Sequence, residues 1–229
     1  MSEKIREMFS GIAGKYDAAN DLLTFGMHRN WKDKLISLSD VKAHHKVLDL
    51  ASGTGDIAFN FAQQTSSSDQ VYALDFSDKM LENLRKRDLY REYPVKTIQG
   101  DVMNLPYDDD TFDITSISYG IRNVDDPKIG IKEMARVTKS GGKICVLETG
   151  KAEGTIGALN NIYSDHIMPV LGSAVTGDYK AYKYLTKSAS DFPYGQEFIN
   201  LMNQSAEFES IKMHKMFFGV SYIYIATVK

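Results

Sequence analysis

The chain has 229 residues, of which 43% are hydrophobic and 25% charged, and its formal net charge is −3. This composition is typical of a folded globular protein, and it lacks the basic excess of most nucleic-acid-binding proteins. Because Cys145 is the only cysteine, the chain has no internal disulfide and no cysteine-based metal site.

Apolar runs and helical patterns alternate along most of the chain. The predicted elements, in chain order, are helices at 4–16 and 28–38, a strand at 47–50, a helix at 56–65, a strand at 71–75, a helix from Ser77, strands at 95–99 and 112–118, a helix at 126–138 and a strand at 143–148. Continuously apolar strands separated by helices predict an α/β fold, with a mostly parallel sheet covered on both faces.

The remaining segments interrupt or end this alternation. Residues 150–190 are helical, with Gly and Pro punctuation, and are interpreted as an insertion. A helix at 194–205 and strands at 213–219 and 222–228 follow, and they predict a terminal antiparallel hairpin. We expect a single domain over 1–229, made of an N-terminal helical cap (1–45), a core (46–149), the insertion and a C-terminal part (191–229).

The loop after the first predicted strand carries a chemical signal. Asp49 is followed by Gly53, Thr54 and Gly55, and glycines here let a ligand approach the backbone closely. A carboxylate at Asp49 would repel the pyrophosphate of a dinucleotide, but it would attract the ammonium or sulfonium of S-adenosylmethionine. The loop therefore favours S-adenosylmethionine over a nicotinamide cofactor.

Acidic residues also end the next two strands. Asp75 is placed to accept hydrogen bonds from ribose hydroxyls, and Asp101 to accept one from an adenine amine beside the backbone N–H of Val102. Packing alone rarely places acids at successive strand ends. The pattern therefore predicts a nucleoside-containing ligand at this edge of the sheet.

The segments VLDLASGTGDIA, YALDFSDKML, GDVMNLPYDDDTFDI and EMARVTKSGGKICVLE resemble successive motifs of class I S-adenosylmethionine-dependent methyltransferases. The blocks REMFSGIAGKYDAANDLLTFGMHRNWK, SISYGIRNVDD, PVLGSAVTGDYKAYKYLTKSASDFP and FGVSYIYIATVK are similar to the ubiquinone/menaquinone biosynthesis C-methyltransferases of the UbiE/MenG type. The resemblance covers nearly the whole chain. Departures such as Ser140, where the family usually has Pro, lie in turns outside the predicted site.

The resemblance implies a seven-stranded Rossmann-like sheet with a C-terminal antiparallel hairpin, and S-adenosylmethionine as cofactor. It also implies cofactor contacts from Thr54, Asp75, Asp101, Val102 and Ser118. The implied reaction is methylation of a ring carbon of a prenylated hydroquinone, with demethylmenaquinol favoured over a benzoquinol. The alternative is O- or N-methylation of another small molecule.

Two candidate catalytic residues follow the fourth strand, where a phenolate acceptor would need stabilisation. Arg122 is a permanent cation, so we interpret it as the phenolate stabiliser, and Asn123 as the residue that orients the other ring oxygen. The alternative for Arg122 is an ion pair with Asp125 or Asp126 at the start of the next helix.

The N-terminal block offers a candidate base and a candidate lid. His28 titrates near neutral pH and is the favoured base, with helix capping beside Trp31 as the alternative. Tyr16, next to Asp17, is placed to bond the cofactor from a lid. His166 in the insertion is a further residue that could face the acceptor. The histidines are too scattered along the chain to predict a metal site.

The insertion also offers apolar residues at helical spacing. These residues either pack on the sheet edge or form a wall for a polyprenyl chain: Leu159, Ile162, Tyr163, Ile167, Met168, Val170 and Leu171. The charged N-terminus does not match a signal peptide, and no apolar run approaches the ~20 residues of a membrane span. We expect a cytoplasmic protein that binds no nucleic acid. Peripheral membrane contact and a homodimer both stay open.

Overall fold

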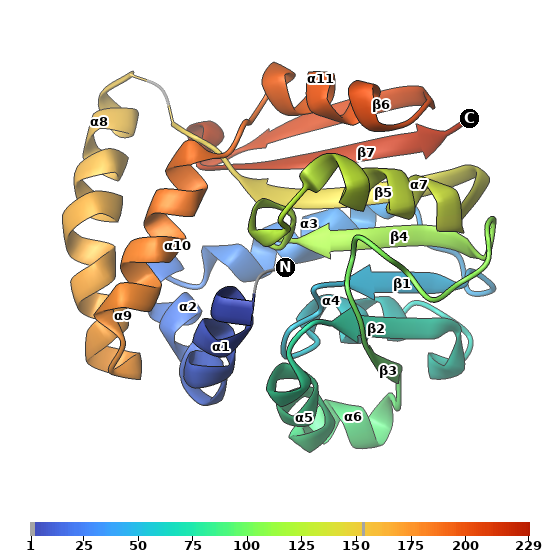
Figure 1. Ribbon diagram of the computed structural model, residues 1–229, viewed down its shortest axis with the longest axis horizontal. Coiled ribbons are helices and arrows are strands. Elements are labelled where there is room, and N and C mark those ends of the chain that lie inside the picture. Colours follow the sequence, from blue (N-terminus) through green and yellow to red (C-terminus); the bar gives the residue numbers. More distant parts are fainter. Residues whose placement is uncertain (1–2, 153) are drawn as a thin grey trace.

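The computed structural model describes residues 3–152 and 154–229. A seven-stranded sheet in the order β3-β2-β1-β4-β5-β7-β6 forms its centre, and β7 runs antiparallel to both of its neighbours (Figure 1). The strands are β1 (Val47–Leu50), β2 (Val71–Asp75), β3 (Lys96–Gln99), β4 (Phe112–Ser118), β5 (Thr138–Thr149), β6 (Phe208–Met216) and β7 (Ser221–Val228). The predicted α/β class, the parallel core and the terminal hairpin are confirmed.

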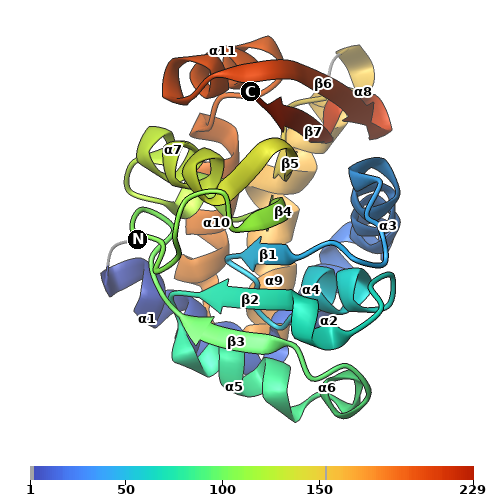
Figure 2. The same ribbon diagram turned by 90° about the vertical axis from the view of Figure 1, so that its right-hand side faces the viewer.

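Helices cover both faces of the sheet (Figures 1 and 2). The helices are α1 (Glu3–Ile12), α2 (Tyr16–Thr24), α3 (Met27–Ser39), α4 (Asp56–Ala62), α5 (Asp78–Lys86), α6 (Asp88–Glu92), α7 (Pro127–Val137), α8 (Gly154–Ile162), α9 (Met168–Thr176), α10 (Tyr179–Asp191) and α11 (Gln196–Ser205). Successive side chains of a strand point to opposite faces, so Leu48 packs towards α7 and α11 while Val47 packs towards α3 and α4. The sheet therefore separates two apolar cores.

A third, smaller core joins the N-terminal helices to the insertion. Ile12 and Leu23 from α1 and α2 pack there with Ala181 and Tyr182 of α10, and all four are buried. A Cβ on Gly172 of α9 would lie 2.3 Å from the ring of Tyr182. The missing side chain therefore lets α9 and α10 approach closely. Helices α1 and α2 and the insertion form one layer beside the carboxyl ends of the parallel strands (Figure 1).

Several predicted boundaries were wrong. The first predicted helix is interrupted by a 3-10 turn at 13–15, and α2 was not predicted at all. The fifth strand begins at Thr138 instead of Lys143, because Thr138 pairs with Phe112 before a bulge. The sixth strand runs from Phe208 to Met216, since a tight turn at 217–219 ends it before the predicted Gly219.

Candidate active site

A cavity of about 780 Å³ opens where β1, β2, β4 and β5 end. The strand-end residues that line it are Asp49, Asp75, Ser118 and Thr149, and side chains from α1, α2, α3 and the insertion form the other walls. The strand order reverses between β1 and its neighbour β4, which is the topological switch point where α/β sheets bind ligands. The predicted edge is therefore the one with the cavity.

The loop after β1 takes its shape from left-handed backbone positions at Ala51, Gly53 and Gly55. Gly53 lines the cavity, and a Cβ added there would meet no atom within 4 Å. Gly55 has a different task, because its Cβ would lie 2.7 Å from Leu84 of α5. Gly55 thus lets α5 pack against the loop, and it does not line the cavity.

Asp75 fixes this loop to the end of β2. Its two carboxylate oxygens accept hydrogen bonds from the backbone N–H of Gly53 and of Ser77, both at 2.8 Å. Burial raises the pKa of Asp75 to about 6, although these hydrogen bonds oppose the shift. Asp75 also lines the cavity, and a carboxylate can accept about four hydrogen bonds, so Asp75 can both shape the loop and accept from a hydroxyl.

Asp49 lies deeper, at 1% exposure. Its Oδ1 accepts a hydrogen bond from Ser116 Oγ at 2.6 Å, whereas Oδ2 is buried without a hydrogen-bond partner in the described part of the chain. Burial raises the pKa of Asp49 to about 7. A buried carboxylate oxygen with no partner is costly, and a cation in the cavity would compensate it.

Asp101 and Val102 do not line the cavity. Asp101 Oδ1 accepts a hydrogen bond from the backbone N–H of Met103 at 3.0 Å, which shapes the turn after β3. Val102 is buried in the core beneath α7, where its Cγ1 lies close to Gly130. Their predicted contact with adenine stays a prediction.

Arg122 forms a buried ion pair with Glu148 at the end of β5, with 2.6 Å between Nη1 and Oε1. The same Nη1 donates to the carbonyl oxygen of Tyr119 at 2.8 Å. Arg122 Nε and Glu148 Oε2 are buried and make no hydrogen bond in the part of the chain that the structure describes. The alternative partner Asp126 instead caps α7, by accepting from the N–H groups of Lys128 and Ile129.

Asn123 lies beside this pair and links it to the insertion. Its Nδ2 donates to the carbonyl oxygen of Tyr119 at 3.3 Å, and its Oδ1 accepts from Tyr184 Oη of α10 at 3.4 Å. Tyr119 itself has a left-handed backbone, with φ of 54°. With this backbone, the carbonyl oxygen of Tyr119 accepts from both Arg122 and Asn123.

His28 is 5% exposed and lines the same cavity from α3. Its Nδ1 lies 2.7 Å from Thr24 Oγ1, and its Nε2 lies 3.7 Å from Asp21 Oδ1. Burial lowers the pKa of His28, and the nearby cation Lys32 lowers it further. Both effects favour the neutral form of His28, which is the form that can act as a base.

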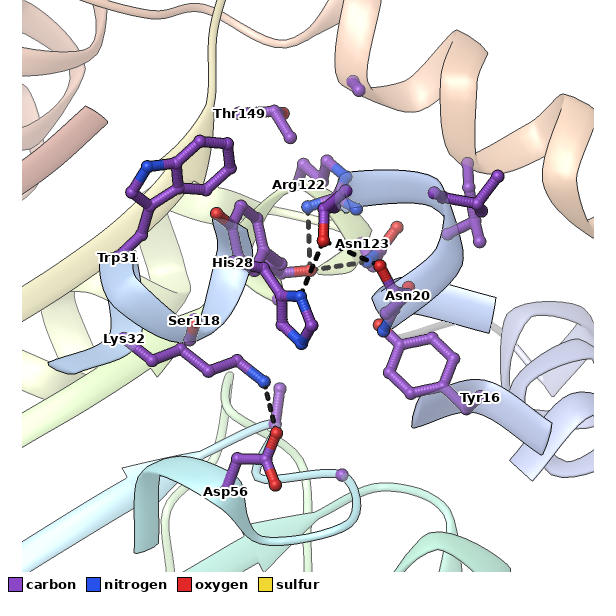
Figure 3. Close-up of a pocket in the computed structure, with 18 of the residues that line it drawn as sticks. Tyr16, Asn20, His28, Trp31, Lys32, Asp56, Ser118, Arg122, Asn123 and Thr149 are labelled. Carbon is purple, nitrogen blue, oxygen red and sulfur yellow. Dashed lines mark hydrogen bonds and ion pairs between the residues drawn. The ribbon is translucent and has the colours of Figure 1, made fainter. Parts of the chain in front are cut away.

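The N-terminal cap is tied to the cavity loop by polar contacts. Thr54 Oγ1 donates to Asp17 Oδ1 of α2 at 2.7 Å, and Lys32 Nζ of α3 lies 2.6 Å from Asp56 Oδ2 (Figure 3). Burial alone would raise the pKa of Asp56, but Lys32 and Arg87 hold it below its ordinary value. The cap therefore contributes to the wall of the cavity, and Tyr16 lines it from α2.

The sequence matches the ubiE/COQ5 methyltransferase family over residues 1–228. A protein from Bdellovibrio bacteriovorus named "Ubiquinone/menaquinone biosynthesis C-methyltransferase UbiE" is 43% identical over 228 residues, which cover 99% of this chain and 97% of the relative. A protein of the same name from Idiomarina loihiensis is 37% identical and covers 94% and 87%. The chain belongs to the ubiE/COQ5 methyltransferase family.

Solved structures agree with this family at the level of the fold. A Thermotoga maritima protein titled "SAM-dependent methyltransferase, possible histamine N-methyltransferase" has a TM-score of 0.69 at 19% identity, and the match covers 98% of this chain and all of that one. A phosphoethanolamine N-methyltransferase from Haemonchus contortus, solved with S-adenosyl-L-methionine, has a TM-score of 0.63 at 13% identity and covers 86% and 52%. The fold is that of class I S-adenosylmethionine-dependent methyltransferases.

The residues that line the cavity fit S-adenosylmethionine. The partnerless Asp49 Oδ2 can take an ammonium, the backbone at Gly53 is open, and Ser118 Oγ is buried without a partner among the described residues. A carboxylate and a hydroxyl with unmet hydrogen-bonding capacity suit the amino-acid end of that molecule, and Asp75 suits its ribose.

Sequence reasoning missed Glu148, Thr24 and Lys32. In the sequence, Glu148 is only a polar residue at the end of an apolar strand. It contacts Arg122 because β5 lies next to β4, and Arg122 follows β4. Thr24 lies in α2, which was not predicted. The left-handed residues Phe25 and Gly26 turn the chain between α2 and α3, so helical periodicity could not have placed Thr24 beside His28.

The insertion meets its predicted role only in part. Tyr163 and Met168 line the cavity, whereas Ile162, Ile167 and Val170 are exposed on its outer side. Leu171 packs against the third core. The side chains of Leu159 and Asp165 lie outside the described residues, and His166 is exposed and does not line the cavity.

The described residues contain neither a metal-binding cluster nor a membrane-spanning helix. No group of three or more His, Cys, Asp or Glu side chains there is arranged to hold a metal ion. No helix in that part of the chain combines the length and apolar character needed to cross a bilayer.

Proposed function

We propose that this protein transfers a methyl group from S-adenosylmethionine to a ring carbon of a prenylated hydroquinone, with demethylmenaquinol as the favoured acceptor. One observation carries the proposal. A single cavity is lined by the carboxylates of Asp49 and Asp75 and by Arg122, Asn123 and His28. The names of the family relatives support the acceptor class.

The donor end of the cavity is built from the ends of β1 and β2. S-adenosylmethionine, when bound, supplies a methyl group made electrophilic by its sulfonium. Asp49 would hold the ammonium of the methionine part, and Asp75 would accept from the ribose hydroxyls. Tyr16 and Ser118 also line the cavity and are proposed as further contacts. The cap lines the cavity through Tyr16 and Asp17, and Asp17 is hydrogen-bonded to Thr54, so we propose that the cap limits the access of water to this end.

The acceptor end is built around Arg122. A phenol carbon becomes nucleophilic once the adjacent hydroxyl loses its proton, because the phenolate pushes electron density into the ring. Arg122 lines the cavity next to Asn123, and we propose that it stabilises the developing phenolate oxygen. Glu148 holds its guanidinium through Nη1 and so limits its motion. Asn123 would orient the second ring oxygen.

The prenyl chain has an apolar path out of the cavity. Met168, Leu185, Phe25 and Phe217 line it, and Phe25 and Phe217 are 75% and 49% exposed. The neighbouring Phe218 is 59% exposed. Exposed aromatic side chains at a cavity mouth mark an interaction site, and a lipid-anchored acceptor would bring this face to the membrane. We propose peripheral membrane contact through these aromatic residues.

The test is methyl transfer from labelled S-adenosylmethionine to chemically reduced, detergent-solubilised demethylmenaquinol, with a demethylated ubiquinol precursor in parallel. Label in the ring of one quinol supports the proposal and identifies the ring class. Label on oxygen or nitrogen of another small molecule, and on neither quinol, would favour the alternative chemistry. The Asp75→Asn variant is the binding control, and we expect it to bind S-adenosylmethionine at least about tenfold more weakly.

A further inference from the structure

The last turn of α2 holds the imidazole of His28 through one nitrogen. Thr24 Oγ1 donates its proton to the carbonyl oxygen of Asn20 at 2.7 Å, and the same Oγ1 lies 2.7 Å from His28 Nδ1. A hydroxyl has only one proton to donate. The contact with Nδ1 must therefore use a lone pair of Thr24 and the proton of His28.

We propose that Thr24 is a positioning residue that keeps His28 in the tautomer with its proton on Nδ1, so that the lone pair of Nε2 is available as a proton acceptor. The tautomer itself depends only on the contacts of Thr24, Asn20 and His28. The use of Nε2 as a base towards a quinol hydroxyl rests on the proposed function.

Charged groups around His28 favour this use of Nε2. Among the described residues, the nearest charged partner of Nε2 is Asp21 Oδ1, at 3.7 Å, which is too far for a hydrogen bond. Asp21 is held in place by Arg29 Nε at 2.8 Å, and Lys32 and Asp56 complete the charges that act on the ring. Lys32 opposes protonation before the reaction, and Asp21 would stabilise the imidazolium that forms.

The step is a simple proton transfer. The O–H bond of the quinol breaks, its electron pair stays on oxygen, and a new N–H bond forms at Nε2. His28 becomes an imidazolium that bonds Thr24 through Nδ1 as before, so nothing in the cap has to rearrange. In the view of Figure 3, His28 lies between Arg122 and Asp56 and points into the cavity, with Tyr16 and Asn20 beside it.

The tautomer is measurable without any substrate. In protein labelled with ¹⁵N-histidine, long-range ¹H–¹⁵N spectra distinguish a protonated from an unprotonated ring nitrogen, and the His28→Gln variant assigns the signal. We expect wild-type His28 to be protonated at Nδ1 and unprotonated at Nε2 near pH 7. Thr24→Val should shift the population towards the other tautomer, and Thr24→Ser should restore the wild-type spectrum.

Activity provides the second readout. We expect Thr24→Val to lower kcat by roughly tenfold or more with unchanged S-adenosylmethionine affinity, and Thr24→Ser to recover most of it. A proton on Nε2 in the wild type, or a Thr24→Val spectrum identical to wild type, would overturn the positioning role. A normal kcat with a shifted tautomer would remove His28 as the base. If no quinol is methylated while the tautomer is as expected, the proposed function fails and the positioning role stands.

Discussion

We expect the buried ion pair of Arg122 and Glu148 to contribute strongly to the stability of the protein. The two side chains are 7% and 2% exposed, and their charged atoms lie 2.6 Å apart. Replacing either partner leaves the other charge in the interior, which costs about 3–5 kcal/mol. For a domain of this size that corresponds to roughly 6–20 °C in Tm. We therefore expect Arg122→Met and Glu148→Leu each to lower Tm within that range, as measured by calorimetry.

The double variant separates the structural role of Arg122 from its proposed catalytic role. Because neither charge is then left alone, we expect Arg122→Met/Glu148→Leu to recover most of the lost stability. We nevertheless expect methyl transfer at least about 100-fold slower than wild type, because the phenolate has lost its cation. Single variants that lose less than about 1 kcal/mol would mean that the pair behaves like a surface pair. A folded double variant with the wild-type rate would refute the catalytic assignment.

Three further predictions concern the two ends of the cavity. Burial raises the pKa of Asp49 from 3.8 to about 7. The folded protein therefore binds this proton more tightly than the unfolded chain does, which stabilises the fold fully below pH 3.8. This contribution is lost as the pH rises from 3.8 to about 7. Relative to Asp49→Asn, the wild-type unfolding free energy should therefore fall over this range by at most about 4 kcal/mol, and parallel pH profiles would contradict this. Gly120→Ala should cost about 1–3 kcal/mol in denaturant unfolding, because its Cβ would lie 2.6 Å from the Cβ of Ala51; an unchanged midpoint would show that the two loops can separate freely. Replacing Phe217 and Phe218 by Ser should weaken sedimentation with anionic lipid vesicles while leaving S-adenosylmethionine affinity intact, and equal sedimentation would locate membrane contact elsewhere.

The two strands β1 and β2 were predictable because each carries a mostly apolar run, which a strand of a parallel sheet buried on both faces requires. Val47–Leu50 and Val71–Asp75 have the predicted bounds. The start of β5 was not predictable, because Thr138 joins the sheet only by pairing with Phe112 across a bulge. Pairing between distant segments leaves no local pattern in the sequence.

The candidate site also contains residues that could be predicted from the sequence and residues that could not. Asp49 and Asp75 were predicted because ligands bind where parallel strands end, and the position of a residue at a strand end is visible in the sequence. Glu148 was missed because its importance comes from one neighbour, Arg122, and that contact depends on how β4 and β5 are joined. The proposed role of Thr24 depends on a hydrogen-bonding choice that no residue pattern encodes.

One hydrogen bond between the cap and the insertion joins segments that lie far apart in the sequence. Tyr163 Oη donates to the carbonyl oxygen of Leu23 at 2.9 Å, although the two residues are 140 positions apart. At a ribosomal rate of about 5–20 residues per second, α2 must wait roughly 10 s after its synthesis before this partner exists. During that time Ala19 and Leu23, which are buried in the finished protein, have no surface from the insertion to cover them. The part of the cavity wall that α2 and the insertion form together can therefore be completed only after the insertion has been synthesised.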